Sequence, residues 1–481
     1  MKSQRFLLIV VFCILAAILL ASFCSQTDNE FTLATFKGGD VTVDEYVDYF
    51  LSSTRYKPDV MPDEENLKEI VTLKALEKIA VLEAMEQGID KDSLYTESIE
   101  NNLRKTLFYK YMRQEIIDSV ITDSLIQVFY KNFTPQYHMS YILRPVVKSS
   151  SAEFEASQQD TINHVYRLLQ SGRSFEDMAS LYSQDITTKD KGGSLGFVIR
   201  ESMGDAALRA AMDTLKDETW STPIRGYEGF YILYKGEKRD VPVPPIEEVR
   251  DKIWQTLYRT RRHDIEKNLQ QRFDELVTKY NFQVDEEHVI QLLTKAGWTV
   301  TASIVSQLDF DALENEMGTA LATYDGGELK LYELFEEKNR APGNKLEFDE
   351  RMESISQRHL LSKHAMELGY QDAPDIKAKM TDVRESLLRS FLHRRNVIDK
   401  AKARMDAINE QSQRAGDKGD QDQFRRVTME RQVREEFEQA LKQKYDFQVV
   451  PKNFDAAMKL AEEKKIEQNQ ERETSNVKRE M

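Results

Sequence analysis

Apolar residues recur with two different periods along the chain, and the change of period marks out residues 137–236. Short apolar runs there predict strands at 141–143 and 230–234. Helical spacing of apolar residues predicts helices between these strands, with the last at about 206–215. Strands and helices mixed over so short a stretch indicate a small α+β domain.

Capping and turn residues delimit the elements of this domain. Ser171-Gly172 ends the helix that contains Ile162 and Val165. Ser174, followed three residues later by Asp177, fits a capping box in which Asp replaces Glu, so a second helix is expected to begin there. Gly192-Gly193 then predicts a turn that leads into a strand.

In order and spacing, these segments resemble the parvulin family of peptidyl-prolyl cis/trans isomerases. The matching marks are YIL at 141–143, GRSFEDMASLYSQD at 172–185, GGSLGF at 192–197, Met203 and TPIRGYEGFYILYKG at 222–236. The resemblance implies catalysis of rotation about X-Pro bonds, which is otherwise slow because the amide loses resonance when it twists. This chemistry requires no nucleophile, metal or cofactor.

The resemblance assigns the polar catalytic positions to Tyr141, Asp185 and Tyr231. Active parvulins usually carry hydrogen-bonded histidines at the first and last of these positions. A tyrosine hydroxyl both donates and accepts, so a pair of tyrosines can keep the floor of the site polar. His138 does not replace them, because strand alternation directs it to the face opposite Tyr141.

The substrate-binding positions implied by the resemblance are Leu195, Met203 and Ala207. Leu195 and Met203 match the apolar floor for the proline ring. The family's aromatic wall falls on Ala207, which would leave the pocket wider. Two interpretations therefore stay open: a domain that still isomerises prolyl bonds, and a domain that binds extended peptide without turnover.

The composition places the domain within a larger, acidic protein. The 481 residues carry a formal charge of −15, with 40% hydrophobic residues and a mean hydropathy of −0.58. This length predicts several domains, and the acidity argues against nucleic acid as a partner. Both cysteines, Cys13 and Cys24, lie in the first 24 residues, so the body has no disulfide.

Residues 1–27 are expected to be a signal peptide or membrane anchor, because Lys2 and Arg5 precede an apolar run from Phe6 to Phe23. Three fates are compatible with this leader: lipidation at Cys24, retention as an uncleaved anchor, or simple cleavage. The first two leave a body tethered to the membrane in the periplasm.

The rest of the chain is predicted to be helical. Residues 28–135 resemble the N-terminal chaperone region of SurA- and PpiD-type periplasmic foldases, and residues 136–240 form the parvulin-like domain. Residues 241–295 begin with a proline-rich linker and continue as one long helix, from 246 to about 280, that packs on the first arm. The basic run 259–263 is expected on a solvated face of this helix.

An internal repeat divides the remainder. Three pairs of segments match. Residues 34–50 (ATFKGGDVTVDEYVDYF) match 322–338 (ATYDGGELKLYELFEEK), and residues 83–89 (EAMEQGI) match 364–370 (HAMELGY). Residues 279–284 (KYNFQV) match 444–449 (KYDFQV). Residues 296–461 are therefore expected to be a second copy of the arm, without an isomerase domain. A polar loop, 411–426, takes the place of that domain, and 462–481 form a polar tail, either a fraying helix or disordered.

No other chemistry is indicated. The seven histidines show no metal-ligand spacing, and no phosphate-binding loop or nucleophile elbow is present, so no metal, cofactor or ATP is expected. The sequence thus predicts a mostly helical α+β protein with duplicated chaperone arms and one inserted parvulin-like domain. By resemblance it is a foldase for unfolded exported polypeptides; the alternatives are a pure holdase or an envelope-assembly scaffold.

Overall fold

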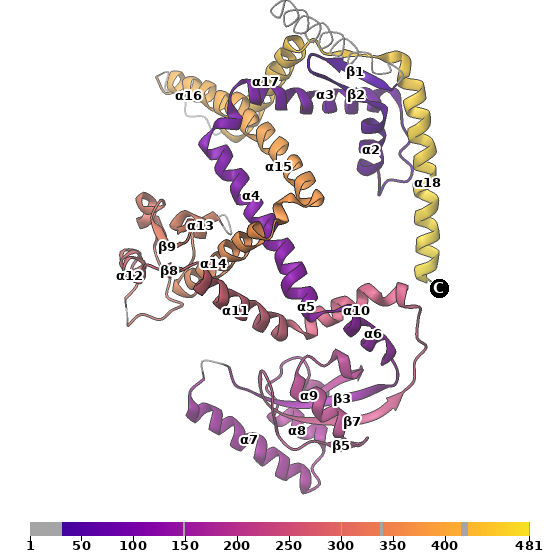
Figure 1. Ribbon diagram of the computed structural model, residues 1–481, viewed down its shortest axis with the longest axis vertical. Coiled ribbons are helices and arrows are strands. Elements are labelled where there is room, and N and C mark those ends of the chain that lie inside the picture. The colour runs from indigo at the N-terminus through magenta and orange to yellow at the C-terminus, as the bar shows by residue number, and fades with distance from the viewer. Residues whose placement is uncertain (1–30, 148–149, 300, 337–339, 415–421, 481) are drawn as a thin grey trace, which may run out of the picture. The chain divides into compact units, whose positions relative to one another are not determined.

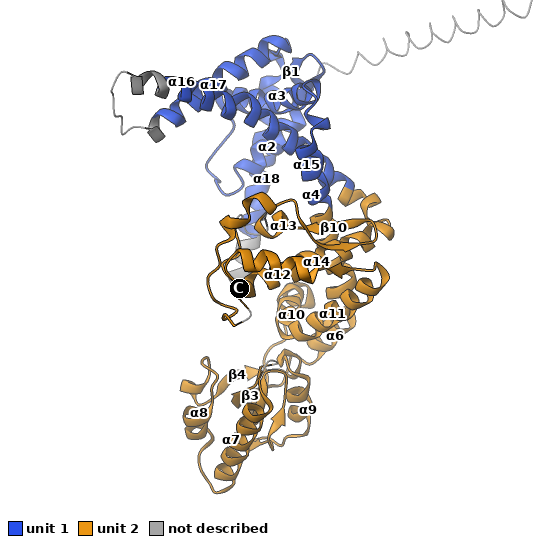
Figure 2. Cartoon of the chain, turned by 90° about the vertical axis from the view of Figure 1, so that its left-hand side faces the viewer, with its two compact units in different colours: residues 1–103, 377–481 blue, residues 104–376 orange. Residues whose placement is uncertain are grey.

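The computed structural model describes residues 31–147, 150–299, 301–336, 340–414 and 422–480, so the expected leader and Cys24 lie outside the described part (Figure 1). The chain divides into two compact units (Figure 2): residues 1–103 with 377–481, and residues 104–376. Within the described residues, no helix has both the length and the apolar character needed to span a bilayer.

Unit 1 combines the first hundred residues with the last hundred. Its elements are β1 (Thr32–Phe36), β2 (Gly39–Thr42), α2 (Val43–Ser53), α3 (Glu64–Glu86), the first part of α4 (Ser93–Tyr111), most of α15 (Pro374–His393), a π-helical segment Arg394–Ile398, α16 (Asp399–Arg414), α17 (Asp422–Lys444), β11 (Gln448–Val449) and α18 (Phe454–Glu480). Strands β1 and β2 form an antiparallel hairpin, with Gly38 at a positive φ of 103° in its turn. Thr42 caps α2 in a reciprocal capping box with Glu45.

The third strand of the unit 1 sheet comes from the other end of the chain. The strand order is β11-β1-β2, with Ala34 opposite Val449 and Thr35 opposite Gln448. Phe454 of α18 is buried in the same apolar core as α2 and α3. We call β1, β2, α2, α3, β11 and α18 module 1.

Unit 2 holds the remaining elements. These are the end of α4, the π-helical segment Met112–Ile117, α5 (Asp118–Val120), α6 (Asp123–Lys131), β3 (Gln136–Pro145), α7 (Ala152–Gln170), α8 (Phe175–Tyr182), β4 (Ser194–Val198), α9 (Ala206–Thr214), β5 (Thr219–Trp220), β6 (Ile224–Arg225), β7 (Gly229–Arg239), α10 (Ile246–Thr260), α11 (Arg262–Lys279), β8 (Gln283–Val284), α12 (Glu286–Lys295), β9 (Ala320–Tyr324), β10 (Gly327–Lys330), α13 (Leu331–Glu336) and α14 (Lys345–Glu367).

A second hairpin sheet in unit 2 has the same arrangement as the first. The order is β10-β9-β8, with Gln283 opposite Thr323 and Val284 opposite Ala322. We call β9, β10, α13, α14, β8 and α12 module 2. Its closing strand, β8, precedes its hairpin by about 40 residues, whereas β11 follows the module 1 hairpin by about 400. Each hairpin is thus completed by the closing strand that the repeat assigns to the other copy.

The remaining sheet of unit 2 forms the domain that the sequence predicts at 136–240. Its strands run antiparallel in the order β4-β3-β7-β5, with β6 paired to β7. Helices α7 and α8 cover one face, where Ile142, Val165 and Ile232 are buried together. Helix α9 packs on the other face.

The structure corrects two expectations and decides between the two alternatives for the polar tail. The single helix predicted from 246 to about 280 is two helices, α10 and α11, which meet at Arg261 with non-helical backbone angles of φ −106° and ψ 14°. The polar tail is helical as far as Glu480 within α18, and its Lys465 is buried. Of the expected loop 411–426, the described residues belong to the ends of α16 and α17, while 415–421 lie outside the described part.

Candidate functional site

Strand alternation sorts the residues of β3 between the two faces of the sheet. Met139, Tyr141 and Leu143 share an apolar cluster with Met203 of the loop before α9, whereas Ile142 joins the opposite cluster under α7 and α8. The face that carries Tyr141 is therefore the one from which a site could be built.

The two tyrosines at the family's histidine positions meet on this face. Tyr141 pairs with Leu233 and Tyr231 pairs with Leu143, so the tyrosines are diagonal neighbours on adjacent strands. Their ring centroids are 5.6 Å apart, and the rings are nearly perpendicular at 87°. This edge-to-face contact is a favourable aromatic geometry.

Each tyrosine hydroxyl donates to a carboxylate. The Tyr141 hydroxyl lies 2.8 Å from Asp185 Oδ2, and the Tyr231 hydroxyl lies 3.3 Å from Glu228 Oε2. Burial raises the pKa of both tyrosines, and the neighbouring carboxylates raise it further. Both phenols are therefore neutral at physiological pH and hold their protons toward the carboxylates.

Asp185 is fixed by the loop that follows α8. Its carboxylate also accepts hydrogen bonds from the Thr187 hydroxyl at 2.9 Å and from Thr188. Burial acts to raise the pKa of Asp185, but the bonds from Thr188, Tyr141 and Thr187 outweigh it and lower the pKa below its ordinary value. Asp185 is thus an ionised acceptor with a fixed orientation.

Beside these tyrosines lies a cavity of about 580 Å³. The residues that line it are Tyr141, Leu195, Val198, Ser202, Met203, Gly204, Asp205, Leu208, Tyr227, Glu228, Tyr231, Arg259, Thr260, Arg262, His263 and Glu266. The lining combines apolar and aromatic side chains with polar and charged ones, which together could hold and orient a ligand.

The structure brings together most of the predicted site residues. Tyr141, Leu195, Met203 and Tyr231 line one cavity, and Asp185 contacts it through the Tyr141 hydroxyl. Ala207 is not among the lining residues; its N–H donates to the carboxylate of Asp205, and Leu208 takes the place in the wall.

His138 lies away from the cavity, as strand alternation predicts. Its Nε2 is 3.0 Å from the Ser194 hydroxyl, and its ring packs edge-on against Phe197 of β4. It is therefore no substitute for the missing histidines.

The turn that contains Gly193 lies so close to β3 that only a glycine fits there. Its φ is +78°, and an added Cβ would lie 2.3 Å from the carbonyl oxygen of Tyr141. In return, the Tyr141 N–H donates to the Gly193 carbonyl at 2.9 Å. In the sequence this glycine pair indicates only a turn. In the structure it also holds the backbone of Tyr141 in position.

Two acidic residues of the site were missed by sequence reasoning. Asp205 caps α9 and accepts the Tyr227 N–H at 2.5 Å, and Glu228 accepts from Tyr231. The only signal for Asp205 was its position as the N-cap of a predicted helix, which has an ordinary structural explanation.

The basic run 259–263 is solvated in part: Arg259, Arg262 and His263 are exposed, as expected, whereas Arg261 is buried. Arg259 and His263 line the cavity, and Arg261 is only 5% exposed. Burial lowers the pKa of Arg261 to about 10. The helix junction outside the sheet domain therefore belongs to the site.

Residues 140–237 match the PPIC-type peptidyl-prolyl isomerase (Rotamase) family model, so the chain contains a domain of this family. About half of the chain is similar to curated foldases. Foldase protein PrsA 2 of Bacillus cereus is 26% identical over 265 residues, which cover 52% of this chain and 84% of the relative.

Similarities to solved structures were also found. A peptidylprolyl isomerase (PrsA) from Bacillus anthracis is 19% identical, covers 47% of this chain and 94% of its own, and has a TM-score of 0.25. A solved structure described as one of two structurally related SurA-like chaperones of Campylobacter jejuni is 21% identical. The match covers 52% of this chain and 97% of that one, with a TM-score of 0.20. The chain thus carries a parvulin-type domain and is similar, over about half of its length, to PrsA foldases.

Proposed function

We propose that this protein is a peptidyl-prolyl cis/trans isomerase and ATP-independent chaperone for exported polypeptides. The observation that supports this most strongly is the cavity in the PPIC-type domain, where Tyr141, Leu195, Met203 and Tyr231 meet. In this proposal, Leu195 and Met203 seat the proline ring, while Tyr141, Asp185 and Tyr231 form the polar floor.

The lining suits the rotation of a prolyl amide. A planar amide is more polar than a twisted one, so moving it from water into a partly apolar cavity disfavours the planar ground state. The neutral hydroxyls and fixed carboxylates offer a preorganised environment to the twisted amide. No bond is broken, and the chain requires no cofactor for this step.

Isomerisation of a prolyl tetrapeptide by the full chain tests this function. We expect acceleration by the wild type and about a tenfold lower kcat/KM for Leu195→Ala, because the missing methyl groups remove roughly 1.4 kcal/mol of apolar contact with the ring. Leu181→Ala is the matched control, since Leu181 belongs to the same domain but is 72% exposed and does not line the cavity.

A pure holdase with an inactive parvulin domain is the second candidate. It is favoured by the two tyrosines at the histidine positions and by the absence of Ala207 from the lining. Absence of acceleration by the wild-type chain, together with suppressed aggregation of an unfolded client, would establish the holdase.

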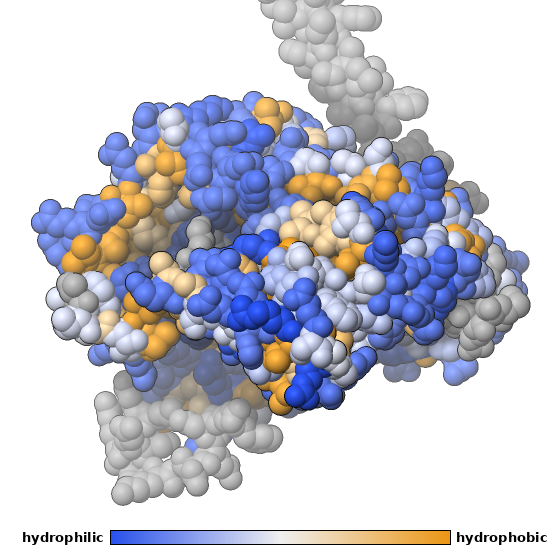
Figure 3. Space-filling model, turned by 90° about the horizontal axis from the view of Figure 1, so that it is seen from below, coloured by the Kyte–Doolittle hydropathy of each residue, from blue (hydrophilic) through white to orange (hydrophobic). Residues whose placement is uncertain are grey.

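Exposed apolar side chains support a chaperone role for the helical arms, which we propose to be duplicated. Figure 3 shows several separate apolar patches within a largely hydrophilic surface. Large apolar side chains are exposed along α3, α4 and the end of α14, namely Met85, Leu94, Tyr109, Met366 and Leu368. Such surfaces bind unfolded chain without sequence preference.

We also propose that the body is periplasmic and tethered to the membrane through residues 1–27. Cys24→Ser in the full chain separates the two forms of tether. It should abolish incorporation of a labelled fatty acid if the chain is a lipoprotein, and should change nothing if the leader is an uncleaved anchor.

A further inference from the structure

One side of the cavity comes from outside the parvulin domain. The matched domain ends at residue 237, but Arg259, Thr260, Arg262, His263 and Glu266 also line the cavity. These residues lie at the junction of α10 and α11. We call them the junction wall.

The junction wall is fastened to the loop that carries Met203. The buried guanidinium of Arg261 donates to the Met203 carbonyl at 3.0 Å, and Arg209 donates to the same carbonyl at 2.8 Å. Gly204 allows the backbones to approach, since an added Cβ would lie 3.0 Å from the Thr260 carbonyl oxygen. A charged donor that is 5% exposed and bonded to this carbonyl makes the contact specific.

The junction wall also supplies an aromatic surface. Tyr227 of the parvulin domain stacks on His263 of α11, with ring centroids 3.8 Å apart and an interplanar angle of 29°. The Tyr227 N–H is held by Asp205, and its hydroxyl lies 3.4 Å from Asp264. Both stacked rings line the cavity, whereas Ala207 does not.

The charges of the junction wall do not favour a substrate residue of either sign. Arg259 and Arg262 are offset in the lining by Asp205, Glu228 and Glu266, and Arg262 forms an ion pair with Glu266 at 2.7 Å. The stacked rings are therefore the distinguishing chemistry of this side. Aromatic surfaces favour aromatic or large apolar groups by stacking and by burial of area.

We propose that the Tyr227–His263 pair is a specificity subsite, shared between the parvulin domain and α11, for an aromatic or large apolar residue next to the proline. This inference rests on the proposed peptide-binding function of the cavity. His263 is its specificity-determining residue, and it lies in the helical arm rather than in the isomerase domain.

The test compares two fluorescent tetrapeptides, one with Phe-Pro and one with Gly-Pro, on the full chain. Binding is measured by fluorescence anisotropy and turnover by isomerisation rate. We expect His263→Ala to weaken binding of the Phe-Pro peptide by about three- to tenfold, with a similar rise in KM, because a stacking partner is lost. The Gly-Pro peptide should change by less than about twofold.

Two further variants sharpen the result. His263→Phe should restore the preference, because it keeps a flat ring against Tyr227. His288→Ala in α12 is the matched control and should change neither peptide, since His288 does not line the cavity. His263 is exposed apart from its stacking contact, so these variants are expected to retain the fold.

Equal effects of His263→Ala on both peptides, or none on either, would overturn the subsite. The binding measurement keeps this outcome separate from failure of the isomerase proposal. A wild type that binds Phe-Pro more tightly than Gly-Pro without accelerating either would disprove turnover and support the subsite.

Discussion

Modules 1 and 2 fold around corresponding contacts, although their chain connections differ. Helices α3 and α14 have the same length, 23 residues, and the repeat aligns them end to end. In module 1 the Tyr445 hydroxyl donates to Glu86 at 3.1 Å; at the aligned positions of module 2, Tyr280 donates to Glu367 at 2.8 Å. In both modules, the tyrosine just before the closing strand is therefore bonded to the same position of the long helix.

The modules differ where charge is buried. The seventh residue of α3 is the buried Ile70, whereas the seventh residue of α14 is Arg351, which is 2% exposed. The fifteenth residue is Lys78, paired with Glu45, in α3, and the buried His359, paired with Glu333, in α14. The comparison teaches that one backbone arrangement tolerates an apolar or a charged residue at the same helix position, provided that the buried charge finds partners.

The largest expected effect concerns the closing strands, each of which pairs with the hairpin of the other copy. Phe454→Ala in α18 should destabilise module 1 by about 3–5 kcal/mol, since truncating a buried Phe leaves a cavity. Hydrogen exchange should accelerate in the hairpin Thr32–Thr42 and stay unchanged in Ala320–Lys330. Val289→Ala, at the aligned position of α12, is the matched variant and should act on the second hairpin instead. Faster exchange in the second hairpin upon Phe454→Ala would contradict the observed pairing.

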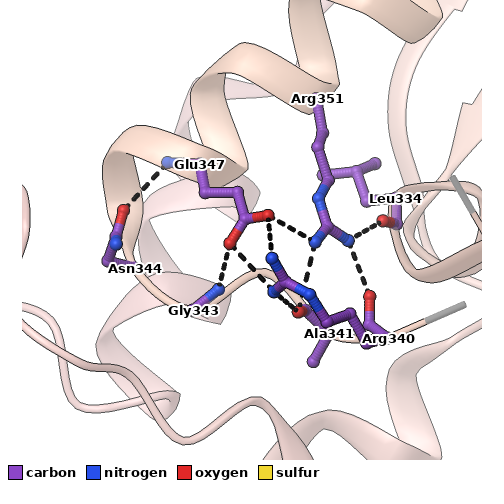
Figure 4. A network of polar contacts seen from close by, with 7 residues as sticks. All are labelled: Leu334, Arg340, Ala341, Gly343, Asn344, Glu347 and Arg351. Atoms are coloured by element: carbon purple, nitrogen blue, oxygen red, sulfur yellow. Dashed lines mark hydrogen bonds and ion pairs between the residues drawn. The ribbon is translucent and has the colours of Figure 1, made fainter. Parts of the chain in front are cut away.

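The buried arginine gives a second, smaller prediction. Arg351 donates to the carbonyls of Leu334 and Arg340, each at 2.6 Å, and to Glu347 at 2.6 Å (Figure 4). Arg351→Ala removes the buried donor to both carbonyls and one of the donors to Glu347, and should cost module 2 about 2–3 kcal/mol.

Arg340→Ala is the internal control for this effect. Arg340 binds the same Glu347 carboxylate at 2.8 Å, but its side chain is 56% exposed. Its removal should cost less than about 1 kcal/mol. Denaturant titrations followed by hydrogen exchange in α14 measure the loss of stability in both variants. Equal losses would show that burial does not determine how much each arginine contributes to stability.

Sequence reasoning succeeded where the signal was local. The helix start predicted from Ser174 and Asp177 is complete within four residues, and α8 begins at Phe175 with Ser174 as its N-cap. The proximity of Tyr141 and Tyr231 came from family resemblance, and the 5.6 Å ring contact agrees with it.

The strand exchange could not be predicted, for a physical reason. Residues 283–284 and 448–449 are both Gln-Val, so their local preference for either hairpin is the same. Which hairpin each one joins depends on how the chain is routed, and no residue encodes that routing locally. The break at Arg261 is similar, since no Gly or Pro occurs in 258–262; the buried bond to Met203 is a tertiary contact.

The buried histidine of module 2 gives the last and smallest prediction, a difference in acid sensitivity. His359 is 1% exposed, its Nε2 is 2.7 Å from Glu333, and its Nδ1 is 2.9 Å from the Tyr324 hydroxyl. Burial lowers the pKa of His359 more than the Glu333 carboxylate raises it, and Arg104 lowers it further. A histidine whose pKa is lower in the folded state takes up protons more readily when unfolded. The stability it contributes is therefore complete above its unfolded pKa of about 6.5 and is lost as pH falls through that value toward the folded pKa.

Module 1 has Lys78 in place of this imidazole, so that module lacks the corresponding effect. Between pH 7 and pH 5 the second hairpin should lose exchange protection relative to the first, by less than Arg351→Ala causes. His359→Gln keeps a polar side chain without a titrating group and should remove most of the pH dependence between the modules. If both hairpins lose protection equally with acid in the wild type, the imidazole is not the source, and the carboxylates that the modules share, Glu45 and Glu333, become the groups to replace.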